Sequence, residues 1–300
     1  MKKLTALCLA ALTLFVASPA LAADLVVRAA EGFTMKVRVN GHPLRLRVDP
    51  EAPGFVVLNP GVARRIGLRP SLLEVEAIIG PVSLDGETKV ALIEHEGMRF
   101  RRRVAWVEGD AAGDADGLVN PANLPFDRVI FELGPLAAGE TEQALTMDYT
   151  REYGLRYAIP IGDRAVHFQF STHKARSMAT AAAGAQLAKV FAGAWTGDAF
   201  EALIEYGVRR PVRAMRLQQK VIVGGIPVSD FLVRTGDHRG ANSLPSDSAD
   251  PAEIVVTGPS GQKAIFMITL GLDGLSACSR LLYERAARRM TLRCRGGAGL

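Results

Sequence analysis

The side chains that could carry hydrolytic chemistry stand at two turns of similar sequence. Asp49 follows an alternating apolar run and opens a polar turn over residues 49–54. A second alternating run ends at Ser171, which Thr172 and His173 follow. Two carboxylates that share one proton can activate water as acid and base, because like charges a few ångströms apart cannot both ionise. These turns offer a single aspartate, so the second aspartate of such a dyad is missing.

Two other arrangements deserve consideration as catalytic sites. Asp116 and Asp273 each precede a glycine in similar surroundings, and they would form a dyad if they met across a cleft. His173 stands close to Ser171, which suggests nucleophilic catalysis. Neighbours on one turn seldom reach each other in the correct geometry, however, and the sequence marks no third member of a triad.

The segment around Asp49 predicts a strand, a turn, a second strand and a short helix. Residues 44–48 alternate leucine or valine with arginine, which is the period of a half-buried strand. Residues 49–54 are rich in proline, glycine and acidic side chains, as turns are. Residues 55–58 form an apolar run, and Asn59 stands where it can cap a helix over residues 60–67 that has proline at its first position.

The second half of the chain repeats this order. A glycine turn and an alternating strand occupy residues 161–170, a polar turn follows at 171–175, and residues 181–193 are rich in alanine and predict a helix. Aligning this segment with residues 41–68, with a slip of one residue at the turn, places Ser171 opposite Asp49. Such a repeat predicts a duplication with one lobe in each half.

The motif at Asp49 resembles the first half of a retropepsin-like aspartic peptidase. That family carries Asp-Thr/Ser-Gly-Ala where this chain has Asp49-Pro50-Glu51-Ala52. Residues 116–121 resemble the family's Asp-Gly-Leu/Ile-Leu-Gly segment, with Asn120-Pro121 in place of Gly and its successor, and residues 271–275 resemble it again. The resemblance covers most of residues 25–295. It implies a mainly β protein of two similar acid-protease lobes with short helices.

The resemblance also implies roles that several residues here no longer fill. In the family, the Thr or Ser after each aspartate bonds across the lobe boundary, and the Gly lets the backbone approach. Pro50 has neither a hydroxyl nor an N–H group, Glu51 adds a side chain, and Ser171-Thr172 supply no carboxylate, so these four residues form a vestigial site. Asp49 is either a surviving catalytic residue or simply opens a turn before proline. We favour the turn, because the dyad chemistry needs both carboxylates.

The first 22 residues predict a cleavable signal peptide. Two lysines precede an apolar run over residues 4–16, and an Ala-x-Ala site ends at Ala22. The run is too short to span a bilayer. We therefore expect a periplasmic or secreted protein with no stable membrane insertion after cleavage. Its two lobes would comprise residues 23–147 and 148–300.

The cysteines that remain after signal removal are Cys278 and Cys294. An isolated pair in an exported chain predicts a disulfide. We expect no metal and no cofactor, because the chain lacks Cys-x-x-Cys and its histidines are scattered. No nucleic acid partner is expected either, since the basic runs at 101–103 and 209–210 are not interleaved with aromatic residues.

Three functions are compatible with these observations. The leading hypothesis is an exported, aspartic-peptidase-like protein that is inactive and binds an extended peptide or protein segment in the cleft between its lobes, by strand addition. The alternative is an active aspartic endopeptidase that uses Asp49 with a second carboxylate outside the aligned motifs. The third is a structural component of the cell envelope. A long exposed loop is also expected between His238 and Pro251.

Overall fold

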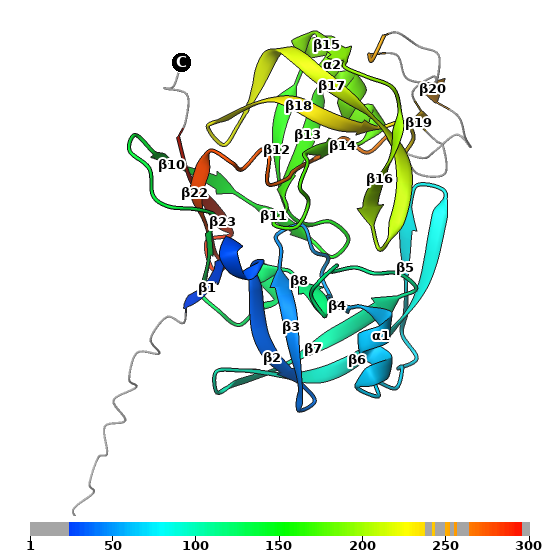
Figure 1. Ribbon diagram of the computed structural model, residues 1–300, viewed down its shortest axis with the longest axis vertical. Helices are drawn as coiled ribbons and strands as arrows, with labels where there is room; N and C mark the ends of the chain where they lie inside the picture. Colours follow the sequence, from blue (N-terminus) through cyan, green and yellow to red (C-terminus); the bar gives the residue numbers. More distant parts are fainter. Residues whose placement is uncertain (1–23, 238–241, 244–249, 253–254, 257–263, 296–300) are drawn as a thin grey trace, which may run out of the picture.

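The computed structural model describes residues 24–237, 242–243, 250–252, 255–256 and 264–295. The predicted signal peptide and most of the predicted loop after His238 lie outside these residues. The described chain is mainly β with barrel-like sheets and two short α-helices, as the sequence predicted (Figure 1). Neither of these helices has the length and hydrophobicity that crossing a bilayer requires.

A closed sheet is built from the first third of the chain, and we call it the N-terminal barrel. Its strand order is β2-β3-β8-β4-β7-β6-β5, and β2 also pairs with β6, which closes the ring. The alternating apolar residues of β3 point inward, as the sequence pattern predicted. The strands are β2 (Thr34–Val39), β3 (His42–Val48), β4 (Val56–Leu58), β5 (Glu74–Ile79), β6 (Val82–His95), β7 (Met98–Val107) and β8 (Gly117–Val119).

A second sheet, the C-terminal sheet, has nine strands and packs on the helix α2 (Ala181–Phe191). Its order is β11-β12-β13-β21-β14-β18-β17-β15, and β16 pairs with β17 beside this path. The strands are β11 (Asp148–Thr150), β12 (Gly154–Ile161), β13 (Arg164–Phe170), β14 (Met178–Ala179), β15 (Gly193–Trp195), β16 (Phe200–Glu205), β17 (Val208–Val223), β18 (Ile226–Arg234) and β21 (Met267–Leu270).

The same pairing pattern occurs in both sheets. In the barrel, β3 runs parallel to β8, β4 runs parallel to β7, and β4 is antiparallel to β8. In the C-terminal sheet, β13 is parallel to β21, β14 is parallel to β18, and β14 is antiparallel to β21. The turn after β3 and the turn after β13 therefore occupy equivalent positions in the two sheets.

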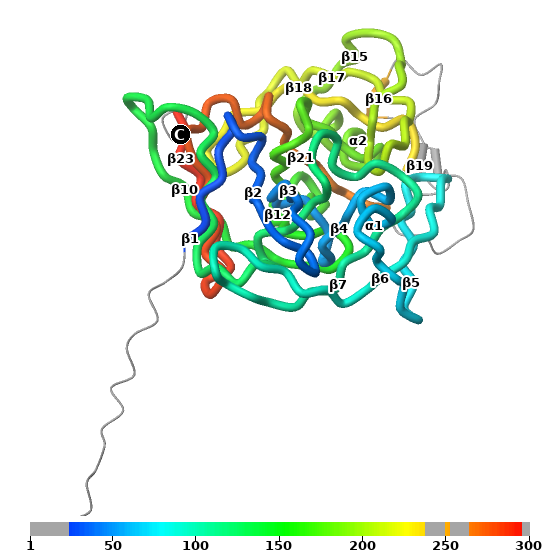
Figure 2. Tube along the Cα trace, turned by 60° about the horizontal axis from the view of Figure 1, so that its bottom comes forward, coloured from blue at the N-terminus to red at the C-terminus, as the bar shows by residue number. Residues whose placement is uncertain are grey.

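A five-stranded sheet combines the start, the middle and the end of the chain. Its order is β1-β9-β22-β23-β10, and Figure 2 shows the blue, green and red segments running together at one side of the molecule. Apolar side chains of all three sheets join in one continuous core. The strands are β1 (Asp24–Arg28), β9 (Arg128–Glu132), β10 (Thr141–Thr146), β22 (Cys278–Glu284) and β23 (Arg289–Cys294). A short pair, β19 (Asn242–Ser243) with β20 (Val255–Val256), completes the described strands.

Several local predictions need correction. The first helix, α1 (Pro60–Arg65), ends earlier than predicted, and Asn59 makes no side-chain cap. Its Oδ1 instead accepts from the backbone N–H groups of Ala111 and Ala112, which ties down the loop before β8. The two Asp-Gly sites are not equivalent, because Asp116 precedes β8 whereas Asp273 follows β21.

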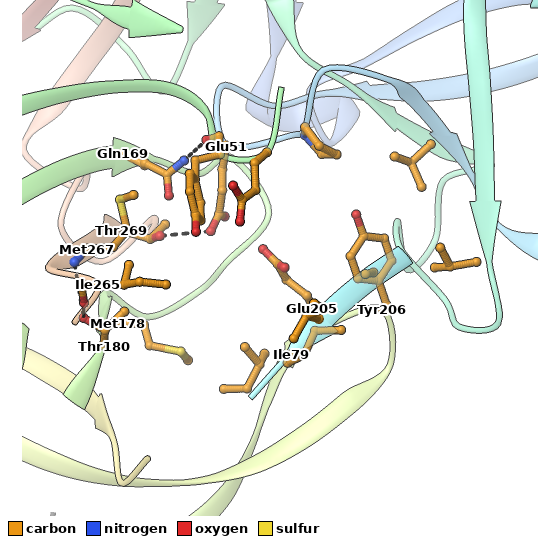
Figure 3. A pocket seen from close by; sticks show the side chains of 18 of the residues that line it. Glu51, Ile79, Gln169, Met178, Thr180, Glu205, Tyr206, Ile265, Met267 and Thr269 are labelled. Atoms are coloured by element: carbon orange, nitrogen blue, oxygen red, sulfur yellow. Dashed lines mark hydrogen bonds between the residues drawn. The ribbon is translucent and has the colours of Figure 1, made fainter. Parts of the chain in front are cut away.

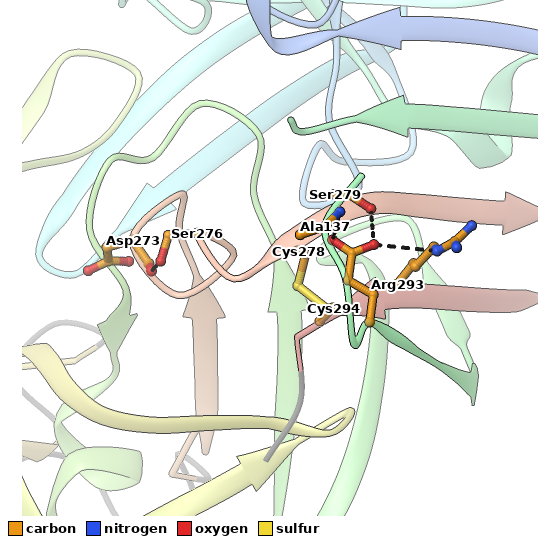
Figure 4. The surroundings of a disulfide bond; sticks show 8 residues. Ala137, Asp273, Ser276, Cys278, Ser279, Arg293 and Cys294 are labelled. Atoms are coloured by element: carbon orange, nitrogen blue, oxygen red, sulfur yellow. Dashed lines mark hydrogen bonds and ion pairs between the residues drawn. A yellow bond between two sulfur atoms is a disulfide. The ribbon is translucent and has the colours of Figure 1, made fainter. Parts of the chain in front are cut away.

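The predicted disulfide between Cys278 and Cys294 is confirmed, with an S–S distance of 2.05 Å (Figure 4). Cys278 begins strand β22. The preceding residues form turns, and Asp273 among them accepts hydrogen bonds from the backbone N–H and the hydroxyl of Ser177. The bridge therefore joins the outer ends of two paired strands, β22 and β23.

Replacing both cysteines by serine is expected to lower the free energy of unfolding by about 3 kcal/mol, because the bridge restricts the unfolded chain. Urea unfolding of oxidised wild-type and C278S/C294S protein measures the difference. Reductant should shift the wild-type midpoint to that of the variant and leave the variant unchanged. A variant that is as stable as the oxidised wild type would contradict this expectation.

Candidate functional site

Asp49 and Ser171 lie at equivalent points just beyond two parallel strand pairs. The backbone N–H of Asp49 donates to the carbonyl of Val119 at the end of β8, at 2.9 Å. The N–H of Ser171 donates to the carbonyl of Leu270 at the end of β21, also at 2.9 Å. Both residues are completely buried. The two turns meet where the N-terminal barrel faces the C-terminal sheet.

The carboxylate of Asp49 is surrounded by donors from the opposite turn. Its Oδ2 accepts from Ser171 Oγ at 3.0 Å and from the Thr172 N–H at 2.9 Å, and it lies 2.7 Å from His173 Nδ1. Its Oδ1 accepts from the Glu51 N–H at 2.8 Å. The opposite turn thus presents hydroxyl, amide and imidazole groups to Asp49, and no carboxylate.

This environment keeps Asp49 ionised. Burial would raise the pKa of its carboxyl group, but the charge and hydrogen bond of His173 lower it, as do the N–H groups of Glu51 and Thr172. The net shift of the pKa is downward. An aspartate that stays deprotonated at neutral pH does not donate a proton to a substrate.

The Ser171–His173 pair lacks the geometry of a nucleophilic site. Ser171 Oγ lies 3.2 Å from His173 Nδ1, the same nitrogen that contacts Asp49. A catalytic histidine uses one ring nitrogen for the serine and the other for the carboxylate. The arrangement therefore holds the turn together and does not activate the hydroxyl.

The alternative pair, Asp116 and Asp273, is divided between separate local networks. Asp116 accepts from the N–H of Arg45 and from the guanidinium of Arg65, each at 2.8 Å. Asp273 lies in the turn after β21 and accepts from the N–H of Ser177, which directly precedes β14. Each carboxylate thus joins segments that lie 51 to 96 residues apart in the chain.

The vestigial residues predicted from the sequence lie in the turn or directly opposite it. The carbonyl oxygens of Pro50 and Ala52 each accept from the Asn120 side-chain amide at 2.7 Å, so Asn120 fixes the shape of the turn. Gly154 packs against this backbone with a positive φ of 68°, and a Cβ there would lie 2.4 Å from the Ala52 oxygen. The backbone of the turn is therefore held in place by Asn120 from the first half of the chain and by Gly154 from the second.

Thr172 makes the contact across the boundary that the resemblance implied for the residue after each aspartate. Its hydroxyl lies 2.9 Å from the carbonyl oxygen of Val48 and 3.1 Å from Asp49 Oδ2. Pro50, at the equivalent position of the first turn, has no hydroxyl to return the contact. Of the two hydrogen bonds that the resemblance implied across the boundary between the turns, the bond from Thr172 is therefore present and the bond from position 50 is not.

Replacing Thr172 by valine is expected to lower the free energy of unfolding by about 1–3 kcal/mol, because the Val48 carbonyl loses its buried hydroxyl donor while the shape is kept. Chemical denaturation measures the change. The T172S variant retains the hydroxyl and serves as the matched control. Equal losses in T172V and T172S would show that the methyl group, and not the hydrogen bond, stabilises this contact.

A cavity of about 440 Å³ adjoins the Asp49 turn, between the N-terminal barrel and the C-terminal sheet. Strand β5 contributes apolar side chains from the barrel, and β14, β16 and β21 contribute others from the opposite side. Figure 3 shows Glu51 on one side of this space, with Glu205 and Tyr206 on the other. Asp49 and Ser171 do not line it, whereas Glu51 and Lys174 do.

An ion-pair cluster lies beside this cavity. The Nζ atom of Lys174 contacts Glu51 Oε1 and lies 3.5 Å from Glu205 Oε1. Thr269 Oγ1 donates to Glu51 Oε1 at 2.9 Å. Burial would lower the pKa of Lys174, but the charges of Glu51 and Glu205 outweigh it and raise the pKa. Sequence reasoning missed Lys174, Glu205 and Thr269 because they belong to no motif and lie far apart in the chain.

Asp49, Glu51 and His173 place potential metal-ligand atoms within 4.8 Å of one another. The fit to a cation is poor. Lys174 already contacts Glu51, and hydrogen-bond donors surround the Asp49 oxygen that would bind the ion. The cluster is better described as an internal network of ion pairs and hydrogen bonds.

Comparisons with known proteins add little to this description. No family model matches the chain, and no curated protein matches it. Among solved structures, the chain is similar to the EIAV protease complexed with the inhibitor HBY-793, at 19% identity and a TM-score of 0.23. That similarity covers 29% of this chain and 79% of the protease chain. The functional interpretation therefore rests on the geometry within this chain.

Proposed function

We propose that this protein binds an extended peptide or protein segment in the cavity between the N-terminal barrel and the C-terminal sheet, without cleaving it. The proposal rests on the difference in accessibility between the buried Asp49 carboxylate and the cavity beside it. The carboxylate is fully buried and bonded to the opposite turn, while the space beside it is open to a ligand and is lined from both halves of the chain.

The absence of cleavage follows from the chemistry of the Asp49 turn. An aspartic mechanism needs two carboxylates that share a proton and a water between them. Here Ser171 occupies the position equivalent to Asp49, and the pKa of Asp49 is lowered by His173. The turn opposite Asp49 thus supplies no second carboxylate with which Asp49 could share a proton.

Binding by strand addition is supported by the strands at the edge of the cavity. Strand β5 ends the strand order of the barrel, and within the described residues β16 pairs with β17 alone. Both strands line the cavity. A strand edge offers unpaired N–H and C=O groups to an extended chain, and pockets for its alternate side chains provide specificity.

The signal peptide predicted over residues 1–22 supports an exported protein, periplasmic or secreted, that meets its partner outside the cytoplasm. A periplasmic or secreted segment of extended conformation is the ligand that such a location would offer. Fractionation of cells expressing the full chain, with the mass of the mature N-terminus, tests this part of the proposal.

The purified mature protein is expected to cleave no peptide by an aspartic mechanism. The test is a broad peptide library incubated at acid and neutral pH, with mass spectrometry of the products and an aspartic-peptidase inhibitor as control. Peptides retained intact on the protein would support the proposal. Inhibitor-sensitive cleavage that disappears in D49A would overturn it.

A second candidate is an aspartic endopeptidase in which Glu51 is the second carboxylate. It is favoured by one observation, the proximity of Glu51 to Asp49 within the 4.8 Å cluster. Against it, Glu51 Oε1 is already engaged by the Lys174 ammonium and by the Thr269 hydroxyl. Cleavage that is lost in E51Q would identify this mechanism, whereas an active dyad elsewhere would survive that substitution.

A further inference from the structure

Two leucines are exposed in the loop between α1 and β5. Leu72 is fully exposed and Leu73 is 50% exposed. Hydrogen bonds fix the backbone on both sides of Leu72. Ser71 donates to the carbonyl of Thr88 from its N–H and from its hydroxyl, each at 2.7 Å, and Thr88 Oγ1 donates to the Leu73 carbonyl at 2.6 Å. Because Thr88 is completely buried, the loop is anchored to β6 and presents its leucines outward.

The loop lies on the outer face of the sheet formed by β6 and β7. Val90 is 46% exposed and pairs across these strands with Arg103. Leu92 pairs in the same way with Arg101, which is exposed. The Arg103 guanidinium donates to the two hydroxyl groups that anchor the loop, at 3.2 and 2.9 Å. The loop and this face therefore form one surface, which we call the leucine–arginine surface and which consists of Arg69, Leu72, Leu73, Val90, Leu92, Arg101 and Arg103.

The leucine–arginine surface is positively charged. Within the described part of the chain its arginines form no ion pair, and Glu94 on the same face is already paired with Arg99 at 2.8 Å. Glu74 and Glu87 are opposite each other in β5 and β6. Side chains alternate between the two faces of a strand, so these two carboxylates point away from the face that carries Val90. The surface thus combines exposed apolar groups with uncompensated positive charge.

These features indicate an anionic membrane surface as the partner. The headgroup region of a bilayer is soft and closes around a protruding side chain, whereas a rigid protein partner would need a matching pocket for Leu72. The phosphate groups of lipids are acceptors that suit the guanidinium groups of the arginines. A protein exported by the signal peptide predicted over residues 1–22 would also meet membrane surfaces in its compartment.

We infer that the leucine–arginine surface docks this protein on anionic membranes without crossing them. Leu72 and Leu73 enter the headgroup region, and the arginines contact the lipid phosphates. None of the residues of this surface is among those that line the cavity. The inference therefore goes beyond the binding of a peptide and does not depend on it.

The test measures co-sedimentation of the purified mature protein with vesicles of phosphatidylcholine alone and of phosphatidylcholine with phosphatidylglycerol in equal parts. Binding to the anionic vesicles is expected to be at least about tenfold stronger and to fall as salt is raised. The L72S/L73S and R69Q/R101Q variants should each lose about tenfold in binding. Leu136 is 65% exposed but lies outside this surface, so L136S is the matched control and should bind as the wild type does.

A second measurement reports on the loop itself. The tryptophan emission of L72W is expected to shift to shorter wavelength when the anionic vesicles are added, whereas that of L136W should not. Absence of vesicle binding, or undiminished binding by L72S/L73S, would overturn the inference. Equal binding to both kinds of vesicle would overturn it as well, because the arginines would then contribute nothing. If the vesicles do not bind and sedimentation velocity shows a dimer that L72S/L73S abolishes, the inference fails and the surface is an interface between two copies of the chain.

Discussion

Replacing Asp49 by alanine is expected to lower the free energy of unfolding by about 3–5 kcal/mol, the range observed when one partner of a buried charged network is removed. The substitution leaves the Ser171 hydroxyl, the Thr172 N–H and the His173 ring without their shared acceptor in a completely buried position. Because those donors belong to the opposite turn, the loss should weaken the contact between the two halves. Urea unfolding at neutral pH measures the effect.

Two matched variants separate the carboxylate from its neighbours. S171A removes one neutral donor and should cost about 1 kcal/mol, the usual net value of a hydrogen bond. D49N keeps the shape of the side chain but removes its charge, and it should fall between S171A and D49A. A D49A protein as stable as the wild type would show that Asp49 only opens a turn and does not join the two halves.

The same carboxylate predicts how stability depends on pH. The pKa of Asp49 in the folded protein lies below its ordinary value of 3.8, so the unfolded state takes up the proton more readily. The stabilisation is therefore fully present above the ordinary pKa and is lost as the pH falls through the folded pKa. The stability difference between wild type and D49N should accordingly be constant near neutral pH and shrink in acid. A difference that grows in acid would contradict the downward shift.

Replacing Lys174 by methionine is the second change with a large expected effect, again about 3–5 kcal/mol of lost stability. The side chain of Lys174 is 11% exposed and that of Glu51 is 8% exposed, so solvent replaces little of the lost interaction. Without the ammonium, the Glu51 carboxylate is left buried with Thr269 as its side-chain donor. Thermal and chemical unfolding of K174M measure the cost.

The matched experiment removes both charges. In the double variant K174M/E51Q no uncompensated carboxylate remains, so much of the stability lost in K174M should return. Glu205 is 42% exposed on its side chain and should be stabilised by water in either variant. If the two single losses simply add in the double variant, Lys174 and Glu51 do not act as a pair.

Local patterns in the sequence were sufficient for much of the fold. The alternation at residues 44–48 has the period of a strand with one buried face, and that strand is β3. The alanine-rich run beyond Thr180 predicted a helix, and α2 ends at Phe191, close to the expected boundary. The disulfide followed from an isolated pair of cysteines in a chain with a predicted signal peptide. These features depend on neighbours in the chain or on composition.

Asn59 shows where local reasoning fails. Asn59 has the residue type and position of a helix cap, but the loop at Ala111 and Ala112 offers it two N–H groups from a distant segment. A contact with a segment more than 50 positions away thus takes the place of the local cap.

The sequence by itself determined the mainly β class, the repeated turn that places Ser171 opposite Asp49, and the shortage of a second aspartate, because each is a matter of residue type and spacing. Only the tertiary structure decided that donors from the opposite turn surround the Asp49 carboxylate and that Lys174 pairs with Glu51 and Glu205 beside a cavity. These contacts join residues more than 100 positions apart in several cases, such as Asp49 with Ser171 at a separation of 122. Folding brings them together through the pairing of strands, and no local pattern encodes their distance or their burial.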